Sequence, residues 1–195
     1  MNAISALENI HLKGLFGYYE DKNEKYLLKI SEKKNLLIIQ IAQYKNSSIS
    51  VEKIKIDNLN LKNEVLNVNS NTDTRILWSG PNNWILITTK KQILKEVTEN
   101  FDANNFAITD LSHSRAIIEI EGGNAKEVLK KGCPYNFNEL KKDNCLNSTF
   151  NGMSVMIDMI NDNPDKARIL TLRSFGESLY HSITDSSLEF GYKGI

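Results

Sequence analysis

Two apolar runs on either side of a short turn constrain the fold of this chain more than any other stretch. The runs RILW (75–78) and WILITT (84–89) flank the sequence GPNN (80–83). Gly and Asn tolerate turn conformations and Pro fixes its own φ, so the pattern predicts a β-hairpin. The next segment, KKQILKEVTENF (90–101), spaces its apolar residues as one face of a helix. A hairpin followed by a helix is therefore expected.

The same order of strands and helix recurs later in the chain. Period-two apolar patterns and short β-branched runs predict further strands at 36–42, 107–111, 116–120, 146–150, 154–160 and 167–172. Possible capping boxes, Asn124 with Glu127 and Ser174 with Glu177, predict two more helices. Residues 46–73 fit either a short helix or a strand, and the final GYKGI is expected to fray. The sequence favours an α+β fold with duplicated βαββαβ-like halves and mixed or antiparallel sheets.

The domain organisation follows from this pattern. Residues 1–34 are polar and charged, with a weak strand signal near Tyr26 to Ile30, and we interpret them as an extended N-terminal arm. Residues 35–195 are expected to form a single α+β domain of two pseudo-repeated halves, about 35–114 and 115–190.

The charge balance and the cysteines exclude several classes of function. Lys and Arg total 24 and so do Asp and Glu, so no basic excess indicates a nucleic-acid partner. The N-terminus lacks a signal-peptide pattern and no apolar run is long enough to span a membrane, so we expect a cytoplasmic protein with no membrane partner. The two cysteines, Cys133 and Cys145, do not have a metal-binding spacing.

Asp110, Ser112 and His113 lie at a predicted corner between two strands and could be interpreted as catalytic residues. His113 could act as a base or could hydrogen-bond the turn, and the turn is the favoured role. A Ser-His-Asp triad is excluded, because three residues within four positions cannot take the separate places of nucleophile, base and orienter. No GxSxG nucleophile elbow occurs either.

Several other residues carry a functional and a structural interpretation side by side. Gly122-Gly123 could cradle a phosphate at a helix start, but a strand-to-helix turn explains the pair more simply. Cys133 follows a predicted helix end, where the dipole disfavours a thiolate. Trp78 and Trp84 bracket the hairpin turn and suggest a protein interface. Two arginines at strand boundaries could each grip a carboxylate or form a structural ion pair; they are Arg115 and Arg173.

Four motifs in order resemble the gamma subunit family of heterotetrameric sarcosine oxidase. They are WSGPNNWILI (78–87), TDLSHSR (109–115), GGNAKEVLKKGCP (122–134) and the late RSF (173–175). The resemblance covers roughly residues 75–180. The D-x-S-H corner and the G-x-x-A-x-x-x-L helix also resemble the folate-binding fold of glycine-cleavage T-proteins. The related iron-sulfur assembly branch is disfavoured, because its K-G-C-Y-x-G-Q signature does not continue here after the cysteine.

The resemblance implies a place in a larger complex. In the family, the alpha subunit holds FAD, NAD and a folate-binding region, beta holds FAD and covalent FMN, and delta binds zinc. Sarcosine is oxidatively demethylated to glycine, the one-carbon unit passes to tetrahydrofolate, and hydrogen peroxide forms. The gamma subunit carries no cofactor, so the chain is expected to be non-catalytic, with no catalytic, cofactor or metal residues, and to assemble with alpha, beta and delta.

Two alternatives remain open. The chain could be a stand-alone folate-binding or aminomethyltransferase-like protein, because it has the same corner motif. It could also belong to a related N-methyl-amino-acid dehydrogenase. In each case, the residues expected at a subunit interface or pocket are Trp78, Trp84, Asp110, His113, Arg115 and Arg173.

Overall fold

The computed structural model describes residues 4–195 and divides into two compact units. Unit 1 contains residues 4–34, Ser114–Lys142 and Asn147–Ile195, and unit 2 contains Asn35–His113 and Asp143–Leu146. The chain passes between the units at residues 34–35, 113–114, 142–143 and 146–147. The region predicted as one domain from residue 35 onward is thus shared between two units, and its later part folds together with the N-terminal residues.

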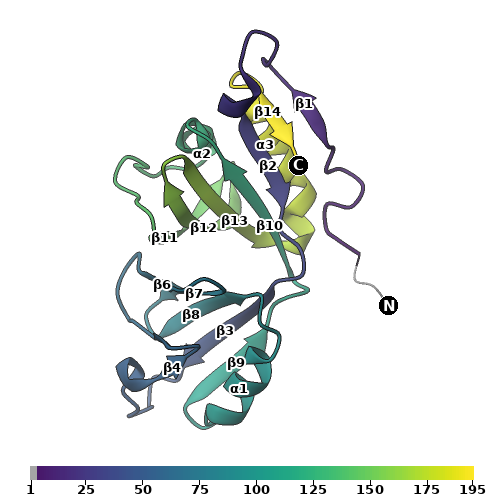
Figure 1. Ribbon diagram of the computed structural model, residues 1–195. Coiled ribbons are helices and arrows are strands. Elements are labelled where there is room, and N and C mark those ends of the chain that lie inside the picture. The colour runs from purple at the N-terminus through teal and green to yellow at the C-terminus, as the bar shows by residue number, and fades with distance from the viewer. Residues whose placement is uncertain (1–3) are drawn as a thin grey trace. The chain divides into compact units, whose positions relative to one another are not determined.

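Unit 2 is built on a five-stranded sheet with the order β6-β7-β8-β3-β9, shown in the lower part of Figure 1. Every neighbouring pair in it is antiparallel. Its strands are β3 (Leu37–Gln43), β6 (Val68–Ser70), β7 (Thr74–Gly80), β8 (Asn83–Thr88) and β9 (Phe106–Asp110). The smaller elements are η2 (Val51–Lys53), β4 (Lys55–Ile56), β5 (Leu59–Asn60) and helix α1 (Ile93–Asn100).

The predicted hairpin is β7–β8, with Trp78 opposite Trp84. Asn82 in its turn has a φ of 55°, a left-handed conformation that Asn adopts more readily than most residues. One face of the sheet carries cross-strand neighbours that bury together, because Ile76 lies opposite Leu86 and Leu86 opposite Ile39. Helix α1 adds Ile93 and Val97 to this core cluster.

Unit 1 is built on a seven-stranded sheet with the order β1-β14-β2-β10-β13-β12-β11. Its strands are β1 (Gly14–Phe16), β2 (Leu28–Glu32), β10 (Arg115–Glu121), β11 (Cys145–Phe150), β12 (Met153–Asp162), β13 (Asp165–Leu172) and β14 (Tyr192–Gly194). Strand β14 runs parallel to β2, whereas β10 is antiparallel to both of its neighbours. The helical elements are η1 (Glu24–Tyr26), α2 (Ala125–Gly132), η3 (Arg173–Phe175) and α3 (Gly176–Ser187).

The core of unit 1 lies between this sheet and helices α2 and α3, which contact each other and the sheet. Strand β10 directs Ala116, Ile118 and Ile120 to the helix side, and all three are at most 3% exposed. A Cβ added at Gly176, the first residue of α3, would lie 3.0 Å from the Cβ of Ala116. The close approach of helix and strand therefore depends on two small residues.

The two sheets share one arrangement of five strands. The order β9-β3-β8-β7-β6 in unit 2 corresponds to β2-β10-β13-β12-β11 in unit 1. In each, a hairpin is followed by a helix, as α1 follows β8 and α3 follows β13. The expected α+β class with mixed or antiparallel sheets is confirmed.

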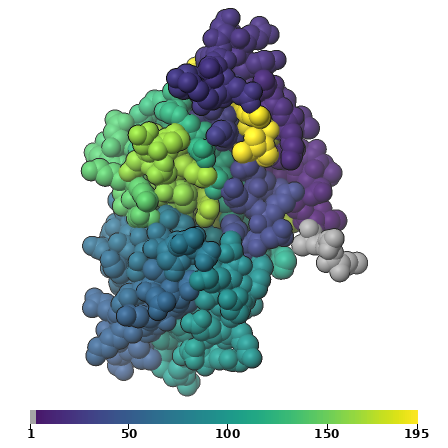
Figure 2. Space-filling view, in the orientation of Figure 1, coloured from purple at the N-terminus to yellow at the C-terminus, as the bar shows by residue number. Residues whose placement is uncertain are grey.

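The chain ends differ from the prediction. Residues 1–34 were expected to form an extended arm; its first three residues lie outside the described residues, but Leu28–Glu32 form an inner strand between β14 and β10. The prediction that GYKGI frays is wrong, because its residues include β14, hydrogen-bonded between β1 and β2. The C-terminal residues (yellow) accordingly lie among the N-terminal ones (purple) in Figure 2. Strands β2 and β14 are short, with five and three residues, and long-range pairing stabilises them.

The two predicted capping boxes are also wrong in detail. Helix α2 begins after Asn124 as expected, but the Asn124 side chain makes no capping hydrogen bond. Helix α3 begins at Gly176, with Phe175 at the N-cap and no side-chain cap. Packing against the sheet stabilises these helix starts instead.

Candidate functional site

The Asp110 corner is held by hydrogen bonds from Ser112. The Ser112 amide and hydroxyl donate to Asp110 Oδ1 at 2.8 Å and 2.5 Å, and Ser112 Oγ accepts from the Ile38 amide at 3.0 Å. Partial burial alone would raise the pKa of Asp110, but the Ser112 hydrogen bonds and the nearby His113 outweigh it and lower that pKa. The D-x-S motif therefore fastens the end of β9 to β3.

His113 itself is exposed, and within residues 4–195 its ring makes no hydrogen bond. Ser112 Oγ is engaged with Asp110 and Ile38 instead of with the imidazole. This geometry matches no nucleophile and base pair, since such a pair needs the two side chains within hydrogen-bond reach. The hydrogen bond to the turn that we favoured for His113 is likewise absent among residues 4–195.

Arg115 and Arg173 come together at one end of unit 1. Arg115 lies opposite Leu172 in the β10–β13 register, and the Arg173 amide donates to the Ser114 carbonyl at 2.9 Å. Arg115 Nη1 lies 3.3 Å from both the carbonyl oxygen and the Oγ of Ser114. The Arg173 guanidinium donates to the carbonyl of Ile4. Two residues far apart in sequence are thereby brought to one place.

A shallow pocket of about 530 Å³ opens beside these arginines. Its lining residues are Ser5, Ala6, Ser114, Leu172, Arg173 and Ser174. All six belong to unit 1. Burial lowers the pKa of the neighbouring Arg115 guanidinium.

The two tryptophans have different environments. Trp84 is 1% exposed, so its ring fills the core of unit 2 and offers no surface to a partner, although its Nε1 donates to the Lys62 carbonyl at 2.7 Å. Trp78 is half-buried and its Nε1 donates to Asn63 Oδ1 at 3.1 Å. Of the pair, Trp78 alone keeps accessible surface for the interface role expected from the sequence.

Gly122 and Cys133 have structural environments. Gly122 has a φ of 143°, and a Cβ there would lie 3.2 Å from the Leu28 Cα. Glycine is therefore needed for the close packing of β2 on the start of α2. The Cys133 thiol is 4% exposed and donates to Ser148 Oγ at 3.1 Å. Burial raises the pKa of this thiol, which disfavours the nucleophilic thiolate.

Two ionic clusters were not predicted from the sequence. Glu119, 4% exposed, accepts contacts from Lys33, Lys166 and Arg168 at 2.9–3.0 Å. Their proximity depends on strand register, so a local sequence pattern carries no signal for it.

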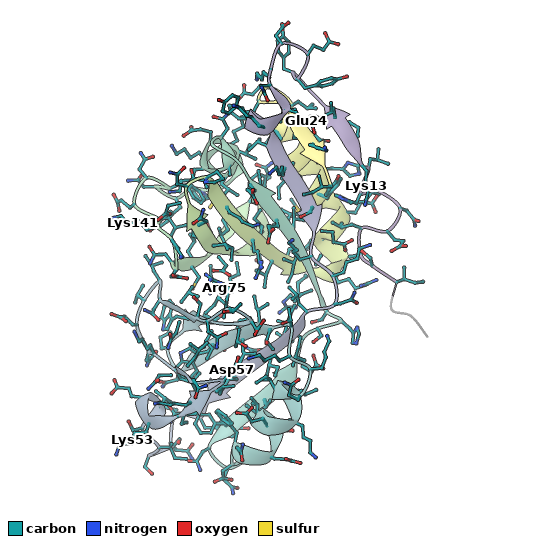
Figure 3. The ribbon with its side chains drawn as sticks, in the orientation of Figure 1. Lys13, Glu24, Lys53, Asp57, Arg75 and Lys141 are labelled. Atoms are coloured by element: carbon teal, nitrogen blue, oxygen red, sulfur yellow. The ribbon has the colours of Figure 1, made fainter. Side chains whose placement is uncertain are left out.

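The second cluster is in unit 2, where Asp57 (labelled in Figure 3) pairs with Lys90 and accepts from the Thr74 hydroxyl at 2.6 Å. The Lys90 ammonium lies 2.8 Å from each Asp57 carboxylate oxygen. The hydrogen bond from Lys90, helped by that from Thr74, lowers the pKa of Asp57. This cluster joins β7 to the segment before β5.

Within residues 4–195, no group of three or more His, Cys, Asp and Glu side chains is placed to hold a metal ion. In the same part of the chain, every helix is too short or too polar to cross a membrane. The cytoplasmic location stays a prediction.

Solved structures define the class of fold. The chain superposes on glycine cleavage system aminomethyltransferase T from Bartonella henselae with a TM-score of 0.61, at 13% identity, over 97% of this chain and 58% of that one. It superposes on heterotetrameric sarcosine oxidase from Corynebacterium sp. U-96, in complex with pyrrole 2-carboxylate, with a TM-score of 0.82. That match has 19% identity and covers 96% of this chain and 95% of the other. The T-protein-like fold is confirmed.

A curated protein with a similar sequence is sarcosine oxidase subunit gamma of Corynebacterium sp. (strain U-96). It is 26% identical over 120 residues, which are 60% of this chain and 58% of that protein. The chain thus matches little more than half the length of this curated relative. No protein-family model matches the chain. The similarity to gamma subunits expected from the motifs is confirmed.

Proposed function

We propose that this chain is a non-catalytic subunit of a sarcosine oxidase-type oxidoreductase. The observation that carries the proposal is the near-full-length likeness to a chain of heterotetrameric sarcosine oxidase. The sequence match to a gamma subunit supports the same assignment. The partners are then subunits of the alpha, beta and delta type, in a hetero-oligomer.

The complex oxidatively demethylates sarcosine to glycine, transfers the one-carbon unit to tetrahydrofolate and forms hydrogen peroxide. FAD, FMN, NAD, tetrahydrofolate and zinc are held by the other subunits. The role of this chain is to stabilise the assembled complex and its subunit contacts. The hydrogen bonds that hold Ser112 at its corner and the burial of the Cys133 thiol support such a structural role.

Co-expression of this chain with the flavoprotein subunits of its own genome tests the assignment. The tagged chain should retain those subunits through size-exclusion chromatography at micromolar concentration, with flavin absorbance in the same peak. A chain that elutes as a free monomer beside intact flavoproteins contradicts the proposal. A tagged, unrelated α+β protein serves as the control.

A stand-alone folate-binding function is the second candidate. The likeness to an aminomethyltransferase of the glycine cleavage system favours it. Titration of the purified chain with tetrahydrofolate separates the two. Saturable binding supports the second candidate, and no binding at millimolar ligand removes it.

The substrate of the complex needs a separate experiment. The assembled complex is assayed with sarcosine and with N-methylglutamate, and the comparison decides which N-methyl amine it oxidises.

A further inference from the structure

The sequence contains four arginines, which differ in whether they form an ion pair. Arg75 pairs with Asp143 at 3.0 Å and Arg168 pairs with Glu119 at 3.0 Å. The other two, Arg115 and Arg173, make hydrogen bonds only to uncharged oxygens among residues 4–195.

One of these two guanidinium groups lines the pocket of unit 1, and the other contacts a lining residue. Arg173 lines it directly, and Arg115 Nη1 is 3.3 Å from the Oγ of the lining residue Ser114. A carboxylate does approach the pocket, because Ser5 donates to Glu32 Oε1. Lys34 lies between this carboxylate and a second one, with its Nζ 3.3 Å from Glu32 Oε2 and 3.4 Å from Glu8 Oε2. Three cations, Arg115, Arg173 and Lys34, thus face two carboxylates here. The pocket therefore keeps an excess of positive charge.

Exposed apolar side chains lie in and next to this positively charged pocket. Leu172, in the pocket wall, is 42% exposed, and Phe175, two residues beyond Arg173, is 40% exposed. Arginine and aromatic side chains together are enriched where proteins dock. A guanidinium fork matches the two oxygens of a carboxylate, and the hydroxyl of the lining residue Ser174 can donate to the same oxygens.

We infer that this pocket binds a carboxylate of a partner protein chain, an acidic side chain or chain terminus next to an apolar residue. The charge complementarity identifies the ligand group, and the exposed leucine and phenylalanine identify its apolar neighbour. The pocket is too shallow to enclose a small molecule on most sides, as sites for free ligands do. The identity of the partner rests on the proposed function, whereas carboxylate binding does not.

The isolated full-length chain tests carboxylate binding by itself. Its amide NMR signals are followed during titration with N-acetyl-leucine and, separately, with N-acetyl-leucine amide, which has the same apolar part and no charge. We expect saturable shifts at Ser114, Arg173 and Ser174 with the acid only. Equal shifts with the amide, or none with the acid at millimolar concentration, overturn the inference.

Variants locate the binding. Arg173→Gln, at an exposed position, should weaken acid binding about tenfold, the loss expected for one charge-assisted pair. Arg173→Lys keeps the positive charge but lacks the planar guanidinium that donates two parallel hydrogen bonds. This variant should bind the acid with intermediate affinity. Lys13→Gln, which removes an exposed cation elsewhere on unit 1, is the control and should bind as the unchanged chain does. Unchanged binding by Arg173→Gln contradicts the site.

The assembled complex tests the partner. If the unchanged chain retains the flavoprotein subunits, Arg115→Gln/Arg173→Gln should lose them at about tenfold lower salt or tenfold higher dilution. A double variant that assembles normally overturns the partner assignment and leaves the proposed function intact. A chain that binds N-acetyl-leucine but no subunits instead contradicts the proposed function alone. An unaltered far-ultraviolet circular dichroism spectrum confirms that the double variant folds.

Discussion

Replacing Glu119 by Gln should destabilise unit 1 more than the same change at Glu121 on the same strand. The Glu119 side chain is 5% exposed and faces Lys33, Lys166 and Arg168, whose side chains are 37%, 27% and 21% exposed. Removing one partner of a buried ion pair costs roughly 3–5 kcal/mol. These cations can partly turn to water, so we expect a loss of about 2–3 kcal/mol. Glu121→Gln is the matched control, because Glu121 is 26% exposed, and it should cost about 0–1 kcal/mol.

Urea unfolding followed by far-ultraviolet circular dichroism measures the difference. Tryptophan fluorescence is a less suitable probe, because both tryptophans belong to unit 2. Burial alone would raise the pKa of Glu119, but hydrogen bonds from Lys166, Lys33 and Arg168 lower it. Its contribution is therefore complete above the ordinary glutamate pKa of about 4.3 and is lost as the pH falls through the lower folded value. Equal stability of the Gln variant and the unchanged chain at neutral pH would refute the reasoning.

Two further predictions concern packing and pH. Gly132→Ala should cost about 1–3 kcal/mol, because the new Cβ would lie 2.7 Å from the buried Phe150 ring, while Gly123→Ala, with no atom within 4 Å, should be nearly neutral; equal urea midpoints for the two variants would count against this packing. The depressed pKa of Asp57 means that its contribution with Lys90 is present above about pH 4 and is lost at lower pH. Tryptophan fluorescence of unit 2 during acid titration should show this loss, and an Asp57→Asn variant that keeps the same acid midpoint would contradict it.

Local signals made the regular elements predictable. The GPNN turn lies between two apolar runs, and the expected hairpin is present as β7–β8. Strand β13 was expected at 167–172 and spans Asp165–Leu172. In both, apolar residues alternate or cluster over a few positions, so the neighbouring sequence carries the information.

The features that the sequence did not predict depend on pairing between strands far apart in the chain. Strand β2 appeared as part of an arm, yet Leu28 and Ile30 are at most 1% exposed because β14 and β10 enclose them. Trp78 and Trp84 are cross-strand partners with equal sequence signals, and their different burial follows from position in the sheet. The hydrogen bond from the Arg173 amide to Ser114, next to Arg115, depends likewise on the β10–β13 register, which local pattern does not fix.

The most direct test of the central claim separates assembly from chemistry in the proposed complex. His113→Ala and Cys133→Ser are each introduced, and both the yield of assembled complex and the hydrogen peroxide formed per assembled complex are measured with sarcosine as substrate. A structural chain predicts an unchanged rate per complex for both variants. Cys133→Ser should lower the yield or stability because the thiol is buried, whereas His113→Ala should lower the yield only if this exposed residue lies at a subunit interface. Complex that assembles in full yield but loses most of its turnover would contradict the account.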